Sequence, residues 1–378
     1  MRIYAEYIWL DGAESPSIRS KSRILNVPDD IKTEEGGFTL NVGDIPVWSF
    51  DGSSTGQAEP GNSDCVLIPC NVASNPFAGN SVIVLCHVFN QNLTAHDSDY
   101  RSKLTEYVSS NKEAIQEQQP VVGFEQEYFL FSDGKPLGWP DRGEPNPQGD
   151  YYCGNGHSRV KGRSVAERHL SLCMSSGISI SGINAEVALG QWEYQIGGLP
   201  TSMIMACDHL IISRFILERV SELEEVDVNF DPKPIQYGDW NGSGLHINIS
   251  TNSMRDEGGL EHIEAFCKKL SSKESVKRIL SEYGEGLDRR LTGKNETSSM
   301  NEFTWGVSDR TASVRIPWSV SESKRGYLED RRPNSNANPY RACLALVKEL
   351  LDIEVKKKAP ATTKKKTSAK KKASNAGE

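Results

Sequence analysis

The sequence lacks the cysteine pairs that mark a disulfide framework or a zinc site. Its eight cysteines are scattered along 378 residues, without a CxxC pair and without a histidine-rich segment beside them. We therefore expect free thiols and a reducing compartment. The opening string, MRIYAEYIWLDG, lacks the basic and apolar regions of a signal peptide, and no apolar run is long enough to cross a bilayer. These absences predict a cytoplasmic protein.

Both common phosphate-binding loops are also missing. The chain has neither a Walker A motif nor the glycine-rich fingerprint of a dinucleotide-binding fold, so any ATP that binds must use another arrangement. The NGSG string at residues 241–244 is too short to be specific. Its two glycines would nevertheless let the backbone approach a small ligand closely.

Charge is unevenly distributed along the chain. The formal net charge is −8, yet residues 356–378 hold nine lysines and one acid, Glu378, which leaves about −16 for the rest. The segment 354–378 is rich in Lys, Ala, Thr and Ser and cannot bury a core, so we expect a disordered tail. Its lysines predict weak, nonspecific contact with nucleic acid or another polyanion, and the alternative is a passive solubility tail.

The length and the 37% of hydrophobic residues predict two folded domains. Residues 1–98 predict a small strand-rich domain, because they contain short runs of β-branched and aromatic residues at 3–10, 18–27 and 81–89. Residues 99–353 mix strand and helix candidates, which predicts an α+β catalytic domain rather than a repeat or a bundle. The strand candidates are 121–131, 184–196, 245–250 and 312–317. The helix candidates are 98–119, 165–176, 207–226, 259–272 and 339–351.

Glu125 and Glu127 lie two residues apart in the run VVGFEQEYFLF, so on a strand they project from the same face. An exposed strand face with two solvated acids is the ordinary interpretation of such a pair. The apolar neighbours Val122 and Phe124 instead favour a buried strand, in which carboxylates need a partner.

Three further acids and one histidine extend this pattern. Glu186 and Glu193 flank a turn at Gly190 that can bring two strand segments side by side, and Glu329 lies in GYLEDRR. With His246 of GSGLHINIS, the five carboxylates and one imidazole could form two oxygen-rich sites for Mg²⁺ or Mn²⁺. His246 taken alone could equally be a hydrogen-bonded core histidine.

Arginines recur through the last third of the chain. They are Arg290, Arg310, Arg315, Arg331 and Arg332. A planar guanidinium grips carboxylate or phosphate with two parallel hydrogen bonds, so this set beside metal-binding acids suits phosphoryl transfer. The alternative, which stays open for Arg332, is a structural ion pair with the excess acids.

These motifs occur together, in the same order, in one known family. The matching strings are WSFDGSSTGQ (48–57), GFEQEYFLF (123–131), GWP (138–140), NPQGDYYCG (146–154), NAEV and QWEYQIG (184–197), DPKPI and WNGSGLHIN (231–248), RRLTG with Glu296 (289–296), VSDRTASVRIP (307–317) and GYLEDRRP (326–333). Over residues 1–353 the chain resembles glutamine synthetase of the eukaryote-type, short-subunit (type II) class. The resemblance implies an N-terminal β-grasp domain and a catalytic domain with a curved antiparallel sheet and surrounding helices. It also implies a homodecamer of two pentameric rings, with active sites between neighbouring subunits.

The resemblance further implies a reaction and its residues. The reaction is the ATP-dependent ligation of ammonia to glutamate through γ-glutamyl phosphate, with Mg²⁺ or Mn²⁺ as cofactor. One metal would be held by Glu127, Glu186 and Glu193, and the other by Glu125, His246 and Glu329. Glutamate would contact Asn241, Gly242, His246, Arg290 and Arg331, and ATP would contact Ser250, Arg310 and Arg315. The ammonium pocket would comprise Asp51 and Ser54 of a neighbouring subunit with Tyr152 and Glu296, while Arg310 and Arg315 would face the transferred phosphoryl group.

Three departures from the family pattern are Trp318, Asn338 and the segment 197–210, which we expect to be an unusually long loop near the nucleotide. Two rival hypotheses compete with an active ligase. One is an inactive relative that keeps the ring as a scaffold, and the complete set of candidate ligands and phosphate-facing arginines disfavours it. The other is the same chemistry with another amine, which the intact ammonium-pocket residues disfavour.

Overall fold

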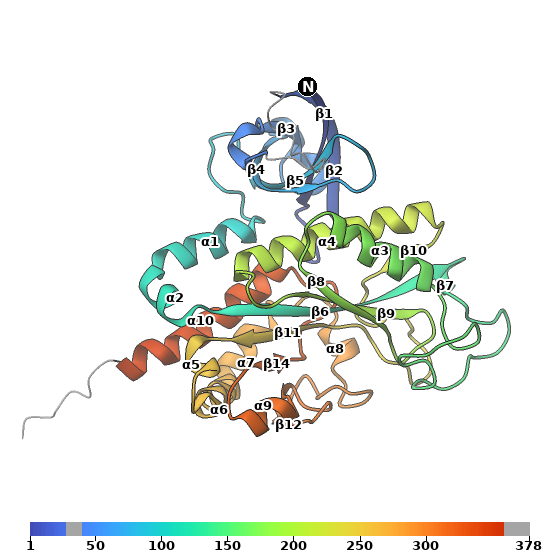
Figure 1. Ribbon diagram of the computed structural model, residues 1–378, viewed down its shortest axis with the longest axis vertical. Coiled ribbons are helices and arrows are strands. Elements are labelled where there is room, and N and C mark those ends of the chain that lie inside the picture. The colour runs from blue at the N-terminus through green and yellow to red at the C-terminus, as the bar shows by residue number, and fades with distance from the viewer. Residues whose placement is uncertain (28–39, 359–378) are drawn as a thin grey trace, which may run out of the picture.

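The computed structural model describes residues 1–27 and 40–358, which form two β-sheets with helices packed against them (Figure 1). In this part of the chain no helix is long and apolar enough to cross a membrane. The tail predicted from 354 lies mostly outside the described residues, although helix α10 (Pro339–Lys358) runs into its first positions.

The first sheet is built from the N-terminal part of the chain. Within the described residues it has five strands in the order β2-β1-β5-β4-β3. They are β1 (Arg2–Leu10), β2 (Ile18–Asn26), β3 (Trp48–Asp51), β4 (Asp64–Ser74) and β5 (Ser81–Phe89). β1 pairs with β5 in parallel, and the other neighbours are antiparallel. The strands predicted at 3–10, 18–27 and 81–89 are confirmed, whereas the sequence pattern does not predict β4, whose alternation is interrupted by a β-bulge after Pro69.

Alternation along β1 divides the apolar residues of this sheet between two cores. Tyr7 and Trp9 point into a small cluster that Phe50 of β3 helps to close. Ile8 points the other way and joins the main core of the protein. The small cluster therefore supports β3 and the turn after it, which carry Asp51.

The second sheet carries most of the candidate site residues. Among the described residues it has nine strands, ordered β12-β13-β14-β11-β6-β9-β8, with β7 and β10 also paired to β6. The strands are β6 (Val121–Ser132), β7 (Lys135–Pro136), β8 (Ile180–Ala185), β9 (Gln191–Gly197), β10 (Asp227–Asn229), β11 (Leu245–Ser250), β12 (Trp305–Val307), β13 (Val314–Ile316) and β14 (Leu328–Asp330). In the described part of this sheet β12 and β13 pair in parallel, and all other neighbouring strands are antiparallel. The sheet is strongly curled, and its helices confirm the α+β class (Figure 1).

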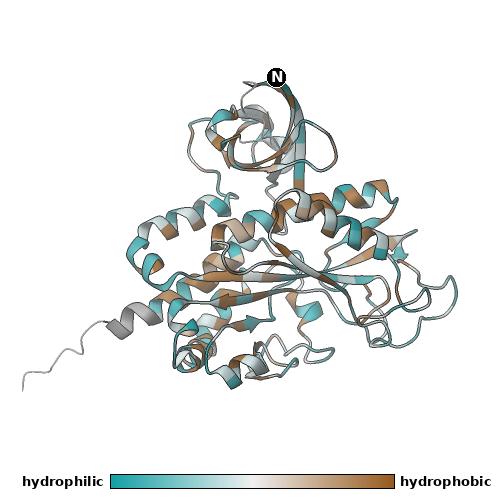
Figure 2. Ribbon diagram, in the orientation of Figure 1, coloured by the Kyte–Doolittle hydropathy of each residue, from teal (hydrophilic) through white to brown (hydrophobic). Residues whose placement is uncertain are grey.

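Helices cover this sheet and enclose the main core. Besides α10 they are α1 (Tyr100–Ser110), α2 (Lys112–Gln118), α3 (Arg163–Ser175), α4 (Met203–Leu223), α5 (Asn252–Arg255), α6 (Gly259–Leu270), α7 (Lys273–Leu280), α8 (Leu287–Arg290) and α9 (Trp318–Ser323). The helices predicted near 98–119, 165–176, 259–272 and 339–351 are therefore confirmed. Figure 2 shows hydrophobic residues concentrated where β6, β9 and α4 meet, and mostly hydrophilic ones on the long loops at the right of the view.

The prediction of a loop over 197–210 is wrong. α4 begins at Met203, where the hydroxyl of Ser202 caps the helix by accepting a hydrogen bond from the backbone N–H of Met205. Only the start of the segment is a turn. α4 is buried on nearly all sides, so its first turn lacks the amphipathic period that would have marked it as a helix.

A buried polar network holds the first sheet against the helices of the second. Asp208 of α4 is fully buried and accepts hydrogen bonds from Arg101 Nε (2.8 Å), Arg101 Nη2 (2.9 Å), the Tyr340 hydroxyl (2.6 Å) and Asn71 Nδ2 (2.9 Å). These partners come from α1, α10 and β4. Since a buried carboxylate is costly without partners, the network favours one docking geometry between the layers.

Candidate functional site

The central strand β6 presents Glu125 and Glu127 on one face, as their spacing predicts. The residues that alternate with them are buried on the opposite face, whereas both glutamates keep partial exposure. β6 lies between β11 and β9 and is antiparallel to both. Glu125 therefore stands opposite His246, and Glu127 stands opposite Glu193.

His246 lies at the centre of a group of carboxylates. Its Nδ1 is 3.3 Å from Glu125 Oε2 and 3.4 Å from Glu329 Oε1, and one ligand atom from each of the three lies within 4.8 Å of the others. A second such group joins Glu127 and Glu193 to His246. Burial lowers the pKa of His246 to about 4, so the ring is neutral and can offer a lone pair. It is both a buried histidine and a candidate ligand.

Glu186 and Glu193 are buried beside other carboxylates. Burial and the charge of Glu127 raise the pKa of Glu186 to about 8. Burial and the charge of Glu186 raise the pKa of Glu193 well above its ordinary value. Carboxylates in such a place repel one another until a cation offsets their charge. Because the donors are five carboxylates and one imidazole, the set fits hard divalent cations such as Mg²⁺ or Mn²⁺.

Three amide side chains that the sequence analysis missed orient these carboxylates. Asn184 and Gln195 stand two residues from the carboxylate that each contacts, whereas Asn248 stands two residues from His246 on β11 and reaches across to Glu125 on β6. A spacing of two from a candidate ligand is the signal that could have found all three, since such residues share a face. The contacts are Asn184 Nδ2 to Glu186 Oε1 (2.8 Å), Gln195 Nε2 to Glu193 Oε1 (2.6 Å) and Asn248 Nδ2 to Glu125 Oε1 (2.8 Å).

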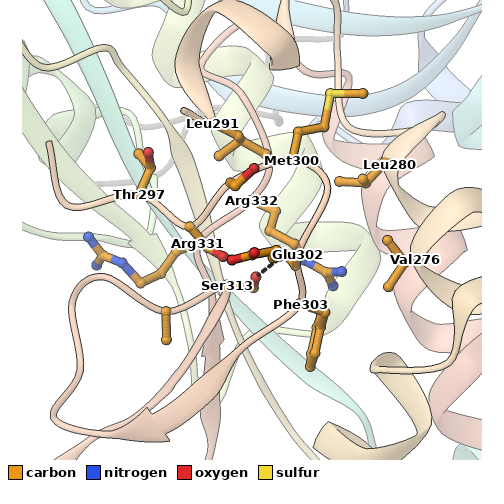
Figure 3. Close-up of a pocket in the computed structure, with 13 residues that line it drawn as sticks. Val276, Leu280, Leu291, Thr297, Met300, Glu302, Phe303, Ser313, Arg331 and Arg332 are labelled. Atoms are coloured by element: carbon orange, nitrogen blue, oxygen red, sulfur yellow. Dashed lines mark hydrogen bonds between the residues drawn. The ribbon is translucent and has the colours of Figure 1, made fainter. Parts of the chain in front are cut away.

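Glu329 binds two of the predicted arginines. Arg315 Nη1 donates to its Oε2 at 2.7 Å and Arg331 Nη1 to its Oε1 at 2.6 Å. Arg331 and Arg332 are adjacent but point in opposite directions (Figure 3). The guanidinium of Arg332 is buried against Asp330, with Nη2 at 2.5 Å from Oδ2. The structural ion pair is therefore the role that the geometry supports for Arg332.

The candidate glutamate pocket is formed around the loop 241–244. Asn241 Oδ1 is buried there without a hydrogen-bond partner among the described residues, so it can accept one from a ligand. At Gly244 a Cβ atom would lie 2.2 Å from Arg290 Nη2, and at Gly242 it would lie 2.1 Å from a backbone carbonyl oxygen. Arg290 donates to the backbone carbonyls of 331–333. It therefore braces the segment that carries Arg331 and Arg332.

Tyr152 and Glu296 approach Glu186 from two different loops. The charge of Glu296 contributes to the raised pKa of Glu186, and burial followed by the charge of Glu186 raises the pKa of Tyr152. Asp51 and Ser54 do not join this group. They lie at the end of β3 in the other sheet (Figure 1), where Ser54 Oγ donates to Asp51 Oδ2 at 2.7 Å. Within one chain the predicted ammonium pocket is therefore incomplete.

A cavity of about 410 Å³ opens beside Glu125. Ser250 lies in its wall and donates through Oγ to the backbone carbonyl of Gly326 at 2.5 Å. Arg310 does not line it; this residue is exposed between β12 and β13, and its charge opposes the rise in the pKa of Tyr152. Its volume is in the range of small-molecule sites, and it adjoins the carboxylate cluster through Glu125.

Of the residues that depart from the family pattern, Asn338 has a clear local role. Its Oδ1 accepts from the backbone N–H of Tyr340 at 3.1 Å, at the start of α10. Asn is a good helix cap because its side-chain oxygen satisfies a free N–H. Trp318 is 66% exposed at the start of α9, and nothing in the structure explains it.

Comparison with known proteins gives consistent matches. Residues 97–377 match the family described as "Glutamine synthetase, catalytic domain". The glutamine synthetase of Streptomyces viridochromogenes is 46% identical over 90% of this chain and 94% of that protein. The "Glutamine synthetase cytosolic isozyme" of Pinus sylvestris is 45% identical over 90% of this chain and 91% of that protein. The "Glutamine synthetase 1, mitochondrial" of Drosophila melanogaster is 43% identical over 93% of this chain and 84% of that protein.

Proposed function

The chain belongs to the glutamine synthetase family, and from that premise we propose how its own residues carry out the reaction. The protein is a ligase that makes glutamine from glutamate and ammonia with ATP. The observation that supports the residue assignments is the cluster of carboxylates around His246, bordered by the guanidinium groups of Arg315 and Arg331.

The carboxylate cluster suits two divalent cations, Mg²⁺ or Mn²⁺. We assign Glu127, Glu186 and Glu193 to one of them and Glu125, His246 and Glu329 to the other. Bound there, the cations would offset the charge of the phosphates and polarise the transferring group. His246 belongs to both groups of neighbouring ligand atoms, which supports two adjacent sites. Asn184, Gln195 and Asn248 hold the carboxylates in place.

The first chemical step converts a poor acyl donor into a good one. A side-chain carboxylate oxygen of glutamate attacks the γ-phosphorus of ATP, the bond to ADP breaks, and γ-glutamyl phosphate forms. Arg315 and Arg310 offset the negative charge of the transferring group. We assign the glutamate to Asn241, Gly242, His246, Arg290 and Arg331. ATP is assigned to Ser250 and the adjoining cavity. Its phosphates would extend past the lining of that cavity to Arg310 and Arg315.

The second step uses ammonium. It is held by carboxylates, loses one proton to them, and attacks the acyl carbon as ammonia. Phosphate then leaves with the electron pair of the broken C–O bond, and the nitrogen gives up a second proton to the departing phosphate to form the amide. Tyr152 and Glu296 form one side of this pocket beside Glu186. Asp51 and Ser54 of a neighbouring copy would form the other side. Hydrogen bonds from nearby serines lower the pKa of the exposed Asp51 carboxylate, so it is an anion that can bind ammonium.

We further propose a homodecamer of two pentameric rings in the cytoplasm. The incomplete ammonium pocket of a single chain supports an assembly in which neighbouring subunits share sites. The free cysteines support the cytoplasm, because thiols persist in a reducing compartment. The names of the relatives include both cytosolic and mitochondrial forms. The lysines of 356–378 suit weak, nonspecific contact with polyanions.

The test is an assay of glutamine formation in which ATP, glutamate and ammonium are omitted in turn. We expect product only with all three and a divalent cation. Glutamine formed without ATP, or none formed by a correctly folded, metal-supplied protein, would contradict the proposal. The second result would favour the scaffold hypothesis. Hydroxylamine and methylamine in place of ammonium would test the hypothesis of another amine.

A further inference from the structure

The side-chain amide of Gln148 contacts two segments around the proposed ammonium pocket, and the backbone of the next residue contacts a third. Gln148 Nε2 donates to Asn295 Oδ1 at 3.2 Å, and Gln148 Oε1 accepts from the backbone N–H of Asn241 at 2.8 Å. The following residue anchors the loop, because the backbone N–H of Gly149 donates to the carbonyl of Val187 at 2.8 Å. Gln148 therefore lies between the glutamate loop, the segment after Glu186 and the loop of Asn295.

Residues 293–297, called the flap here, carry Glu296 and are held by Asn295. Asn295 Nδ2 donates to Asp239 Oδ1 at 3.1 Å and to the carbonyl of Trp240 at 3.2 Å. Asn295 and Glu296 both have left-handed backbones, with φ of 53° and 59°. Asn tolerates this conformation, but Glu does so at a cost, so contacts elsewhere must hold it. The side chain of Asn295 supplies them.

We propose that Gln148 and Asn295 are positioning residues that couple the position of the flap to that of the glutamate loop. The proposal rests on the proposed function, in which Glu296 contacts ammonium and Asn241 contacts glutamate. The amide of Gln148 donates to Asn295 through its nitrogen and accepts from Asn241 through its oxygen. One orientation of the amide can therefore make both hydrogen bonds only when the flap and the glutamate loop are both in place. If either hydrogen bond is lost, the amide is free to rotate, and the remaining hydrogen bond is weakened. Bound glutamate, by fixing the loop at Asn241, thereby stabilises the flap in the position that Asn295 holds here.

The position of the flap matters because γ-glutamyl phosphate has competing fates. Water can attack its acyl carbon and regenerate glutamate, or the α-amino nitrogen can attack it and form a five-membered lactam. In both cases the C–O bond to phosphate breaks, phosphate leaves with the electron pair, and the attacking group loses a proton to solvent. A displaced flap admits water and leaves the intermediate longer without ammonium. Phosphate release then exceeds glutamine formation.

The experiment compares Gln148→Leu and Asn295→Gly with the wild-type protein in its assembled, metal-supplied form. Glycine keeps the left-handed backbone accessible, so Asn295→Gly removes the contacts without adding strain. The matched control is Asn80→Gly, the same replacement at another left-handed Asn (φ 52°), which lies between β4 and β5. Each protein is assayed for the ratio of phosphate to glutamine and lactam, for KM of ammonium and of glutamate, and for thermal unfolding.

We expect wild type and Asn80→Gly to release one phosphate per glutamine. Gln148→Leu and Asn295→Gly, the two link variants, should both release more phosphate than glutamine, while the rate of phosphate release itself changes little. Both should raise KM for ammonium about fivefold, because that is the effect of one neutral hydrogen bond on an equilibrium. The double variant should be affected less than additively, because both changes break one link. Should Gln148→Leu not fold, Gln148→Glu keeps the acceptor for Asn241 and removes the donor to Asn295.

Wild-type stoichiometry and KM in the folded link variants would overturn the proposal, as would fully additive effects in the double variant. A wild-type protein that makes no glutamine would instead overturn the proposed function, and this inference with it. The two failures are therefore distinguishable in the same set of assays.

Discussion

Glu329 shows how much the site depends on the partners of a single residue. Its carboxylate is 1% exposed, it accepts hydrogen bonds from Arg315 and Arg331, and one oxygen lies 3.4 Å from His246 Nδ1. Two guanidinium partners hold the group in one orientation, which determines the oxygen that faces the imidazole. Replacement of either arginine should therefore alter both the charge and the geometry of the cluster.

Arg315→Ala should lower turnover by about 10³-fold or more, since arginines that stabilise charge in phosphoryl transfer contribute effects of that size. The oligomer should stay intact, because Arg315 lies at the site rather than in the core. The measurement is steady-state glutamine formation with size-exclusion chromatography. Arg325→Ala, at an exposed arginine of the same region, is the matched control. Near-normal turnover of Arg315→Ala would remove this residue from the mechanism.

Gly244→Ala should raise KM for glutamate and lower the free energy of unfolding by about 1–3 kcal/mol, the usual cost of an atom forced into a packed site. Its Cβ would lie 2.2 Å from Arg290 Nη2 and 2.9 Å from His246 Nε2. Gly79→Ala serves as control, because a Cβ there would meet nothing within 4 Å. Equal kinetics and unfolding for the two variants would contradict the close approach at Gly244.

At the scale of elements, the strands of the second sheet bring together residues that are far apart in the sequence. β6 supplies two carboxylates, β9 and the turn before it supply two more, and β11 and β14 supply the histidine and the fifth carboxylate. The antiparallel register sets which of them face one another. The helices contribute chiefly by packing, and α4 adds Asp208, which holds α1, α10 and β4 together.

Arg101→Ala should lower the free energy of unfolding by about 3–5 kcal/mol, because it leaves the buried Asp208 without its charged partner. Arg168→Ala breaks the more exposed pair with Glu224 and should cost less than about 1 kcal/mol. Denaturant unfolding of both variants checks the comparison. Similar losses in the two would show that the network around Asp208 does not stabilise the docking of the layers.

At the scale of the whole molecule, the candidate residues fall on two separate sheets. The carboxylates and arginines converge on the curled sheet, while Asp51 and Ser54 remain on the N-terminal one (Figure 1). Asn71 of the N-terminal sheet donates a hydrogen bond to Asp208 of α4, which ties this sheet to the helices that cover the curled sheet of the same chain. A neighbouring copy is therefore the source we propose for the second half of the ammonium pocket.

Mixed assemblies of Asp51→Ala and Glu127→Ala chains should regain activity that neither variant has alone. Asp51→Ala should still make γ-glutamyl phosphate, because ATP and glutamate do not need this carboxylate, but it should use ammonium poorly. In mixed rings some sites combine an intact Asp51 with an intact Glu127. Activity is measured after dissociation and reassembly, with exchange verified by differently tagged chains. No recovery despite verified exchange would count against a shared site.

Truncation after Val355 should leave glutamine synthesis and the proposed ring assembly nearly unchanged, since the lysine-rich segment contains none of the candidate site residues. The full-length protein should bind duplex nucleic acid at low salt and release it steeply as salt rises, and several tails on one ring would add avidity. A salt titration of both proteins against labelled duplex measures this. Equal binding by the two, or none by the full-length protein, would eliminate the polyanion role.

The sequence by itself determined the chemistry that is available to this protein. The spacing of two between Glu125 and Glu127 requires a shared face on a strand, and Gly190 allows the turn that returns β9 beside β8. These are local constraints, so the pattern along the chain carries them. The order of the motifs was also sufficient for the family resemblance. The same local reasoning predicted most helices and the strands with regular alternation.

Only the tertiary structure decided which polar groups meet. Strand register places His246 between Glu125 and Glu329, and opposite side-chain directions send Arg331 into the site and Arg332 to Asp330 (Figure 3). These contacts join residues separated by up to 121 positions, and side-chain patterns contain no information about such distances. The start of α4 was decided in the same way, because a helix buried on all sides has no amphipathic period and is stabilised by its surroundings.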